Sequence, residues 1–162
     1  MKKIIIIILL LVLTIAMLPY NSKAAKQGTG LEVESPKLFV HIADLSKDAK
    51  EFGLSKQLIR SKIELALRQN DIKVLNESSL FYPYTLYVEI LFAGNKYSGG
   101  FGIALYFTRN IEYSSGGTNY KKYATSYNQS MIGTSTDKDY IMNSLEDQVD
   151  IFINEFHRAN NF

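Results

Sequence analysis

Two long stretches of the chain place an apolar residue at every second position, and this alternation constrains the fold more than any other feature. The alternating positions in residues 84–92 and 99–113 are Leu86, Val88, Ile90 and Phe92, and then Phe101, Ile103, Leu105 and Phe107. Successive side chains of a β-strand point to opposite faces, so each stretch predicts a strand with one apolar face. The turn-rich connection around residues 93–100 predicts that the two strands form a hairpin.

A third long strand is predicted after the sequence Ser-Ser-Gly-Gly-Thr-Asn at residues 114–119, which is typical of a hairpin loop. This strand is rich in hydroxyl groups. Strict alternation places five of its side chains on a single face: Tyr123, Thr125, Tyr127, Gln129 and Met131. A serine nucleophile needs a base and a third, orienting group, but the chain has two histidines and no Gly-x-Ser-x-Gly motif. We therefore interpret the hydroxyl groups as one face of a strand.

Two other segments repeat their apolar residues at intervals of three and four, which predicts amphipathic helices. The first follows Ser55, a good N-cap residue, and is expected to end in a left-handed conformation at Asn70 or Asp71. Its apolar stripe consists of Ile59, Ile63, Ala66 and Leu67. The second is expected to be capped by Ser135 or Thr136. Its stripe consists of Ile141, Leu145, Val149, Phe152, Ile153 and Phe156.

Shorter apolar runs at residues 37–45 and 72–76 add two strands, which gives the element order β-α-β-β-β-β-α. Apolar residues on both faces of the first run predict a central strand. Because the sheet has one strongly apolar face and each helix has one apolar stripe, we expect an α+β two-layer sandwich, with an antiparallel-rich sheet and two helices on one face. The opposite face, either wet or covered by a partner, carries Tyr87, Glu89, Tyr106 and Thr108.

The first 24 residues have the pattern of a secretory signal peptide, with Lys2 and Lys3, an apolar run of fifteen residues and a cleavage site after Ala24. Such a run spans roughly 22 Å as a helix, which is short for a ~30 Å hydrocarbon core, and an uncleaved anchor is the alternative. We expect an exported protein, periplasmic or secreted, that contacts a membrane only through a retained leader. Residues 25–36 are expected to be a flexible lead-in, and residues 37–160 a single α+β domain.

Charge and composition exclude several functions. Residues 1–24 hold three of the 18 basic residues and none of the 16 acidic ones, so 15 basic and 16 acidic residues remain, without a basic surface for nucleic acid. The absence of cysteine excludes thiolate catalysis and iron–sulfur clusters. His41 and His157 stand too far apart in the sequence to suggest a metal site. The sequence therefore predicts no catalytic residue, no metal site and no cofactor.

Tyrosine is the residue type that most suggests a site. The chain has 11 tyrosines and no tryptophan, and most of the tyrosines fall in the predicted β half. Tyrosine supplies large amphipathic contact area at protein interfaces, although β-propensity alone also accounts for its use in strands. The candidate interaction face consists of Tyr87, Glu89, Tyr106, Thr108, Tyr123 and Tyr127.

Three groups of residues follow a pattern known from other proteins: Asn70-Asp71-Ile72-Lys73-Val74, Tyr127 with Gly133, and Val149, Asp150, Phe152, Phe156 and Asn160. On these residues, the stretch 37–160 resembles a family of small exported bacterial proteins of unknown function. The chain departs from the family pattern at Asp71, where glycine is expected, and at Tyr127, where tryptophan is expected. At the level of the fold it is also similar to the amino-terminal domain of TolB and to LpoB-type lipoproteins, although it lacks a lipidation cysteine and a β-propeller. This resemblance implies a domain that binds proteins in the periplasm.

The favoured hypothesis is a non-catalytic domain that binds another cell-envelope protein through a strand edge or through its tyrosine-bearing sheet face. The alternative is an exported hydrolase or a small-ligand-binding protein with a pocket between the sheet and the helices. Such a pocket would be lined by His41, Asp44 or Glu89. The two hypotheses differ in whether polar groups converge in a deep cleft.

Overall fold

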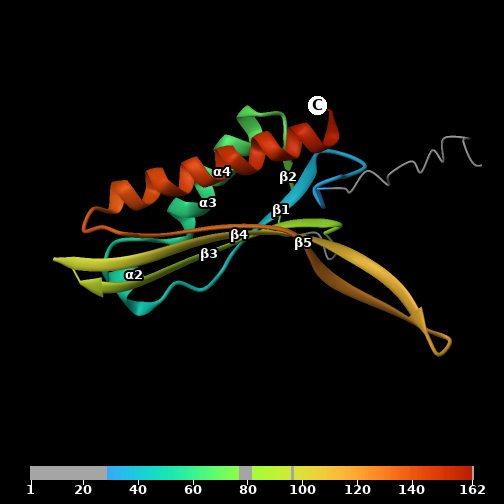
Figure 1. Cartoon of the computed structure of the whole chain (residues 1–162), viewed down its shortest axis with the longest axis horizontal. Helices are drawn as coiled ribbons and strands as arrows, with labels where there is room; N and C mark the ends of the chain where they lie inside the picture. Colours follow the sequence, from blue (N-terminus) through green and yellow to red (C-terminus); the bar gives the residue numbers. More distant parts are fainter. Residues whose placement is uncertain (1–28, 77–81, 96, 162) are drawn as a thin grey trace, which may run out of the picture.

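The computed structural model describes residues 29–76, 82–95 and 97–161, and the predicted signal peptide lies outside them. A five-stranded sheet forms one layer, in the order β2-β1-β3-β4-β5 (Figure 1). Its strands are β1 (Lys37–Ile42), β2 (Lys73–Val74), β3 (Tyr84–Asn95), β4 (Ser98–Ser115) and β5 (Thr118–Thr134). Helices α3 (Lys56–Gln69) and α4 (Lys138–Asn160) cover one face, which confirms the α+β two-layer architecture. Among the described residues, no helix has the length and apolar character needed to span a membrane.

The sheet is mixed, which refines the antiparallel-rich prediction. Strands β3, β4 and β5 pair antiparallel in long ladders, whereas β1 pairs parallel to both β2 and β3. The chain leaves β1, passes through helices and returns in the same direction into β2, and parallel strands require a crossover of this kind. Strand β1 lies between β2 and β3, as its two apolar faces predicted.

The ends of the two long helices follow local capping chemistry. Ser55 caps α3, and Asp71 adopts a left-handed conformation with φ of 57° after it, both as predicted. Helix α4 is capped by Asp137 rather than by Ser135 or Thr136. The Asp137 carboxylate accepts a hydrogen bond at 2.8 Å from the amide of the second helical residue. A carboxylate at this position is also favoured by the positive end of the helix dipole.

A short helix, α2 (Lys47–Glu51), was not predicted. Its N-cap is Ser46, whose hydroxyl accepts a hydrogen bond from the Ala49 amide at 3.2 Å. The same hydroxyl donates to the Phe92 carbonyl at 3.0 Å, which ties α2 to β3. Five residues are too few to show an apolar stripe, so periodicity alone did not indicate this helix.

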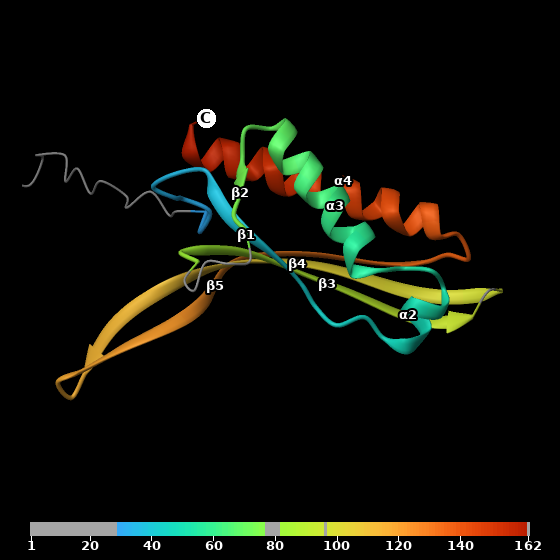
Figure 2. The same ribbon diagram turned by 180° about the vertical axis from the view of Figure 1, so that it is seen from behind.

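The core lies between the sheet and the two long helices (Figure 2). The predicted apolar stripes are buried there, except that Ala66 is only partly buried. Phe107 is fully buried, and its ring centroid lies 6.0 Å from those of both Phe152 and Phe156 on α4. On the neighbouring strand, the ring of Tyr84 stacks against Phe107 at 5.8 Å. Each large side chain buried here contributes roughly 1.5–3 kcal/mol before entropy costs, so this aromatic cluster fixes α4 on the sheet.

The described part of the predicted lead-in, residues 29–36, packs against the domain, and residues 25–28 lie outside the described residues. Leu31 is fully buried in the core. The Asn160 side chain, at the end of α4, donates to the Leu31 carbonyl at 3.0 Å. The Arg109 guanidinium donates to the Gly30 carbonyl at 2.7 Å. Side chains that are distant in the sequence hold this stretch in place, so local periodicity does not predict its position.

Strands β4 and β5 extend beyond β3 and form a two-stranded arm (Figure 1). The last pair of β4 with β3 is at Arg109, and the arm continues to the turn at Gly116 and Gly117, whose φ angles are 58° and 80°. Left-handed angles at both positions are those of a tight two-residue hairpin turn. The rings of Tyr113 and Tyr120 stack across the arm at 5.2 Å. An isolated two-stranded ribbon is only marginally stable in water, so this cross-strand pair supports the arm.

Candidate interaction face

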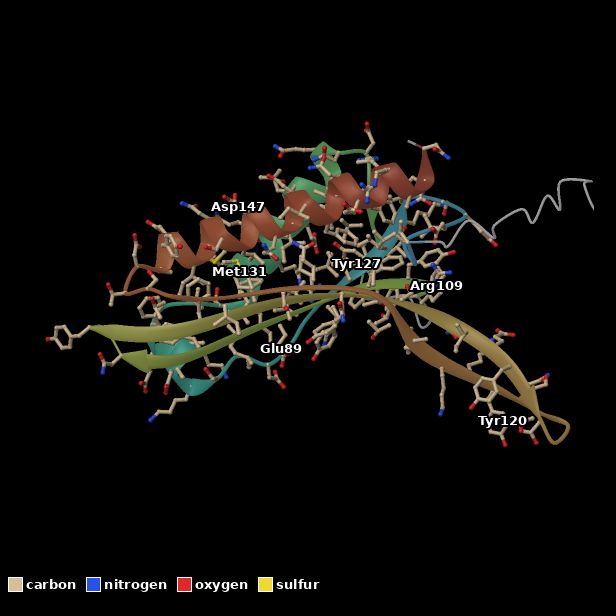
Figure 3. The ribbon with its side chains drawn as sticks, viewed as in Figure 1. Glu89, Arg109, Tyr120, Tyr127, Met131 and Asp147 are labelled. Atoms are coloured by element: carbon tan, nitrogen blue, oxygen red, sulfur yellow. The ribbon has the colours of Figure 1, made fainter. Side chains whose placement is uncertain are left out.

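Five of the six residues predicted for the interaction face lie on the side of the sheet that points away from the helices, which we call the open face. Alternation along β3 sends Leu86 to the core and Tyr87 to the other side. Tyr106 lies opposite Tyr87 in the β3–β4 ladder, and directly paired residues share a face. Figure 3 shows Glu89 on this side. The five residues are Tyr87, Glu89, Tyr106, Thr108 and Tyr123.

Tyr127 does not belong to the open face, which corrects the prediction. A β-bulge at Ser126 shifts the register of β5 against β4 between Phe107 and Thr108. One extra residue turns all the following side chains to the other face of a strand. Tyr127 is therefore directed toward the helices (Figure 3), where it packs against the core. Burial there raises the pKa of the Tyr127 phenol above its ordinary value.

Substitution of the two tyrosines of β5 tests this assignment of faces. We expect Tyr127→Ala to lower the free energy of unfolding by about 1.5–3 kcal/mol, because it removes a ring that packs on the core. Tyr123 is exposed on the same strand, and Tyr123→Ala should change the free energy of unfolding by less than about 0.5 kcal/mol. Urea denaturation followed by circular dichroism measures both values. Equal losses would contradict the placement of the two rings on opposite faces.

The open face is hollowed beside Tyr87. The hollow is a pocket of about 410 Å³, and its lining consists of Phe39, His41, Tyr82, Thr85, Tyr87, Thr108 and Tyr123. The rings of Phe39 and Tyr82 stack with centroids 4.0 Å apart, and those of His41 and Tyr87 stack at 5.0 Å. Aromatic walls of this kind suit an apolar group, with tyrosine hydroxyls at hand for a few hydrogen bonds. We call this hollow the aromatic pocket.

The electrostatics of the aromatic pocket favour an uncharged occupant. None of its lining residues is an aspartate, glutamate, lysine or arginine. Glu89 follows on the same face of β3, so a negative charge stands beside the pocket rather than in it.

Asp44, named in the alternative hypothesis, is exposed, and the Lys56 ammonium lies 2.6 Å from its carboxylate. The hydrogen bond from Lys56 holds the pKa of Asp44 below its usual value.

The alternative hypothesis placed a pocket between the sheet and the helices, lined by His41, Asp44 or Glu89, and the structure does not bring these residues there. His41 and Glu89 lie on the open face, and Asp44 is exposed beyond β1. The space between the sheet and the helices is filled by buried apolar side chains. The reason lies in the alternation of β1 and β3, which turns the polar residues of both strands away from the core.

Three residues of the aromatic pocket, Phe39, Tyr82 and Thr85, were not among the predicted site residues. Phe39 shares a face with His41 in β1, so alternation could have included it, but its apolar character suggested the core. Tyr82 precedes β3 and shows no pattern of its own. In the described part of the chain, no group of three or more histidine, aspartate or glutamate side chains is placed to hold a metal ion.

No protein-family model and no curated protein matches the chain. The kind of site is therefore inferred from its geometry alone. A concave, aromatic patch without charged walls, on a sheet face that α3 and α4 leave uncovered, offers apolar area and ring faces to an occupant. These are the properties of a binding surface.

Proposed function

We propose that the protein is a non-catalytic, exported domain of a bacterial cell envelope, periplasmic or secreted, that binds another envelope protein through its open face. The observation that carries the proposal is the aromatic pocket beside Tyr87. An apolar concavity exposed to water gains free energy when a partner fills it. The signal-peptide pattern of residues 1–24 supports export, and the resemblance to small exported bacterial proteins agrees with it.

The side chains around the aromatic pocket suit a protein partner. The rings of Tyr87 and Tyr106 lie 6.0 Å apart on neighbouring strands, and Tyr123 stands exposed at the base of the arm. Tyrosine is enriched among the residues that carry most of the binding energy at interfaces, because it combines a large rigid ring with a hydroxyl group. A leucine- or phenylalanine-sized side chain of the partner would occupy the pocket, with Glu89 at the rim.

Crosslinking of the processed protein in its native cell, followed by identification of the captured protein, tests the proposal. We expect an envelope protein. With that partner purified, the Tyr87→Ala/Tyr106→Ala double variant should bind at least tenfold more weakly by calorimetric titration, which corresponds to about 1.4 kcal/mol or more. The matched control is Tyr97→Ala, because Tyr97 is 76% exposed in the turn between β3 and β4, away from the aromatic pocket. Unchanged affinity of the double variant would contradict binding through the open face.

A second candidate is an exported carrier of a small apolar ligand, which the volume of the aromatic pocket favours. About 410 Å³ lies within the range of roughly 300–1,000 Å³ typical of small-molecule sites. Native mass spectrometry of the protein purified from its own cell would detect such a ligand. Retention of one by the normal protein, and its loss in Tyr82→Ala, would favour the carrier. No arrangement of the described residues favours the hydrolase form of the alternative.

A further inference from the structure

Strand β5 forms one edge of the sheet, and α4 runs above it (Figure 1). Between them lies a groove of about 570 Å³, lined by residues 127–130 of β5 and by Gln148, Ile151 and Glu155 of α4. Four consecutive strand residues direct their side chains to both faces in turn. Because all four line the same groove, it follows the outer edge of β5. We call it the edge groove.

The backbone of β5 presents its polar groups to the edge groove. In an antiparallel ladder, successive residues direct their N–H and C=O groups to opposite sides. The Ser135 amide donates to the Gly99 carbonyl at 3.0 Å. The backbone N–H and C=O groups of Gly99, and of every second residue of β4 up to Phe107, therefore point toward β5. Their partners, which point back toward β4, are Gly133, Met131, Gln129 and Tyr127. The residues between them, which point outward, are Asn128, Ser130 and Ile132.

Two isoleucines beside this edge remain exposed to solvent. Ile151 of α4 is 46% exposed and lines the edge groove on the helix side of the sheet. Ile132 of β5 is 90% exposed, and its pairing with Gly102 places it on the open face. A strand added beside β5 would lie between the two, with side chains alternating toward one and then the other. It would bury apolar area that both residues leave in water.

The rest of the β5 edge is protected by devices that are common on edge strands. At the bulge, Gly30 crosses the strand, and the Ser126 hydroxyl donates to its carbonyl at 2.6 Å. On the arm, Lys121 and Lys122 place charges along the strand. Within the described chain, the stretch from Asn128 to Ile132 has neither a crossing segment nor a lysine. This stretch is therefore the accessible part of the edge.

Helix α4 determines the charge beside the edge groove. It contains five acidic and two basic residues. Glu155, one turn after Ile151, lines the edge groove and pairs with Arg158, whereas Asp147, one turn before Ile151, lies on the side of α4 turned away from the sheet (Figure 3). A second copy of the chain would bring another acidic α4 to the same gap, whereas lysine or arginine from a different protein would offset this charge. Four residues of a helix span about 6 Å, which is close to the roughly 6.6 Å spanned by two strand residues. Side chains two positions apart on an added strand would therefore match helix residues four positions apart.

We propose that β5 from Asn128 to Ile132 accepts an extended, basic segment of a partner protein as a sixth strand beneath α4. The segment places an apolar side chain against Ile151 and a lysine or arginine two positions away, near Glu155. Backbone hydrogen bonds supply the affinity, and α4 selects the side chains. The inference rests on the proposed interaction function, but it concerns an edge of the sheet rather than the open face.

The probe for this proposal is the blocked peptide Thr-Lys-Thr-Val-Thr-Lys-Thr, titrated into the ¹⁵N-labelled processed protein and followed by nuclear magnetic resonance. We expect saturable shifts and slower hydrogen exchange at the amides of Asn128, Ser130 and Ile132. Ser130→Pro removes an outward amide and leaves the bonds to β4 in place, so it should weaken binding at least tenfold. The Tyr87→Ala/Tyr106→Ala variant should bind the peptide normally, which separates a failure of this inference from a failure of the open-face proposal.

Two control peptides make the test specific. A peptide N-methylated at alternate backbone amides, and one with glutamate in place of lysine, should each bind at least tenfold more weakly. Equal binding of the N-methylated peptide, or no saturable shift along β5, would overturn the proposal. Self-association of the protein that Ser130→Pro abolishes would also overturn it, because the occupant would then be a second copy. If Ser130→Pro does not fold, Ile151→Lys at an exposed position supplies the same test by repelling the basic peptide.

Discussion

Phe107→Ala is expected to lower the free energy of unfolding by about 3–5 kcal/mol. The ring is fully buried in β4, between Tyr84 on the neighbouring strand and Phe152 and Phe156 on α4. Its removal forfeits the transfer free energy of the ring and leaves a cavity between the two layers. Single domains are stable by only about 5–15 kcal/mol, so the midpoint of urea denaturation, followed by circular dichroism, should fall markedly.

A matched control for this substitution is Ile132→Ala. Ile132 lies in the adjacent strand and is 90% exposed, so its truncation should change the free energy of unfolding by less than about 0.5 kcal/mol. Phe107→Leu keeps much of the apolar volume and should lose clearly less stability than the alanine variant. A loss below about 1 kcal/mol for Phe107→Ala would contradict the packing of α4 on β4.

The burial of Phe107 was predictable from alternation alone, because the side of a strand on which a residue lies is a local property. The same holds for the apolar stripe of α4, whose residues from Ile141 to Phe156 are buried as their spacing predicted. The parallel pairing of β1 was not predictable in this way. It depends on where the crossover through α2 and α3 returns to the sheet, and local periodicity contains no information about partners that are distant in the sequence.

Tyr127 shows where alternation fails within the candidate site. The bulge at Ser126 arises from the pairing of β5 with β4, and nothing in the sequence of β5 by itself marks the extra residue. A candidate face drawn by strict alternation therefore included one residue from the other side of the sheet. The aromatic pocket has a similar origin, because Tyr82 reaches Phe39 only through the tertiary fold. Membership of the open face was partly predictable, whereas the concavity was not.

Gly30→Ala is expected to detach the N-terminal segment and to lower the free energy of unfolding by about 2–4 kcal/mol. Gly30 has φ of 82°, a conformation that costs other residues about 1–2 kcal/mol. A Cβ atom there would also lie 1.9 Å from the Ser126 carbonyl oxygen, which is backbone of a paired strand and cannot move away. The segment must move instead, and this exposes Leu31, whose burial contributes roughly 1.5–3 kcal/mol.

The control for the backbone contribution is Gly53→Ala. Gly53 has φ of 91°, but the nearest atom to its added Cβ would be Cδ of the flexible Lys138 side chain at 3.7 Å. This variant should therefore lose only the conformational cost of about 1–2 kcal/mol. Limited proteolysis supplies an independent measurement, since cleavage near Leu31 should become faster in Gly30→Ala and stay unchanged in Gly53→Ala. Equal stability losses and equal cleavage in the two variants would contradict the close approach of Gly30 to Ser126.

A double-variant cycle with Asn160→Ala decides whether Gly30 acts by holding the segment. The Asn160 side chain accepts from the Val33 amide at 2.8 Å and donates to the Leu31 carbonyl at 3.0 Å, so its removal weakens the same attachment. Because Gly30→Ala and Asn160→Ala would release the same segment, the double variant should lose little more stability than Gly30→Ala alone. Asn160 also donates to the Phe156 carbonyl at 2.8 Å, within α4. If the stability loss of the double variant equals the sum of the two single losses within about 0.5 kcal/mol, Asn160 acts through this helical contact instead. The two residues then do not hold one common segment.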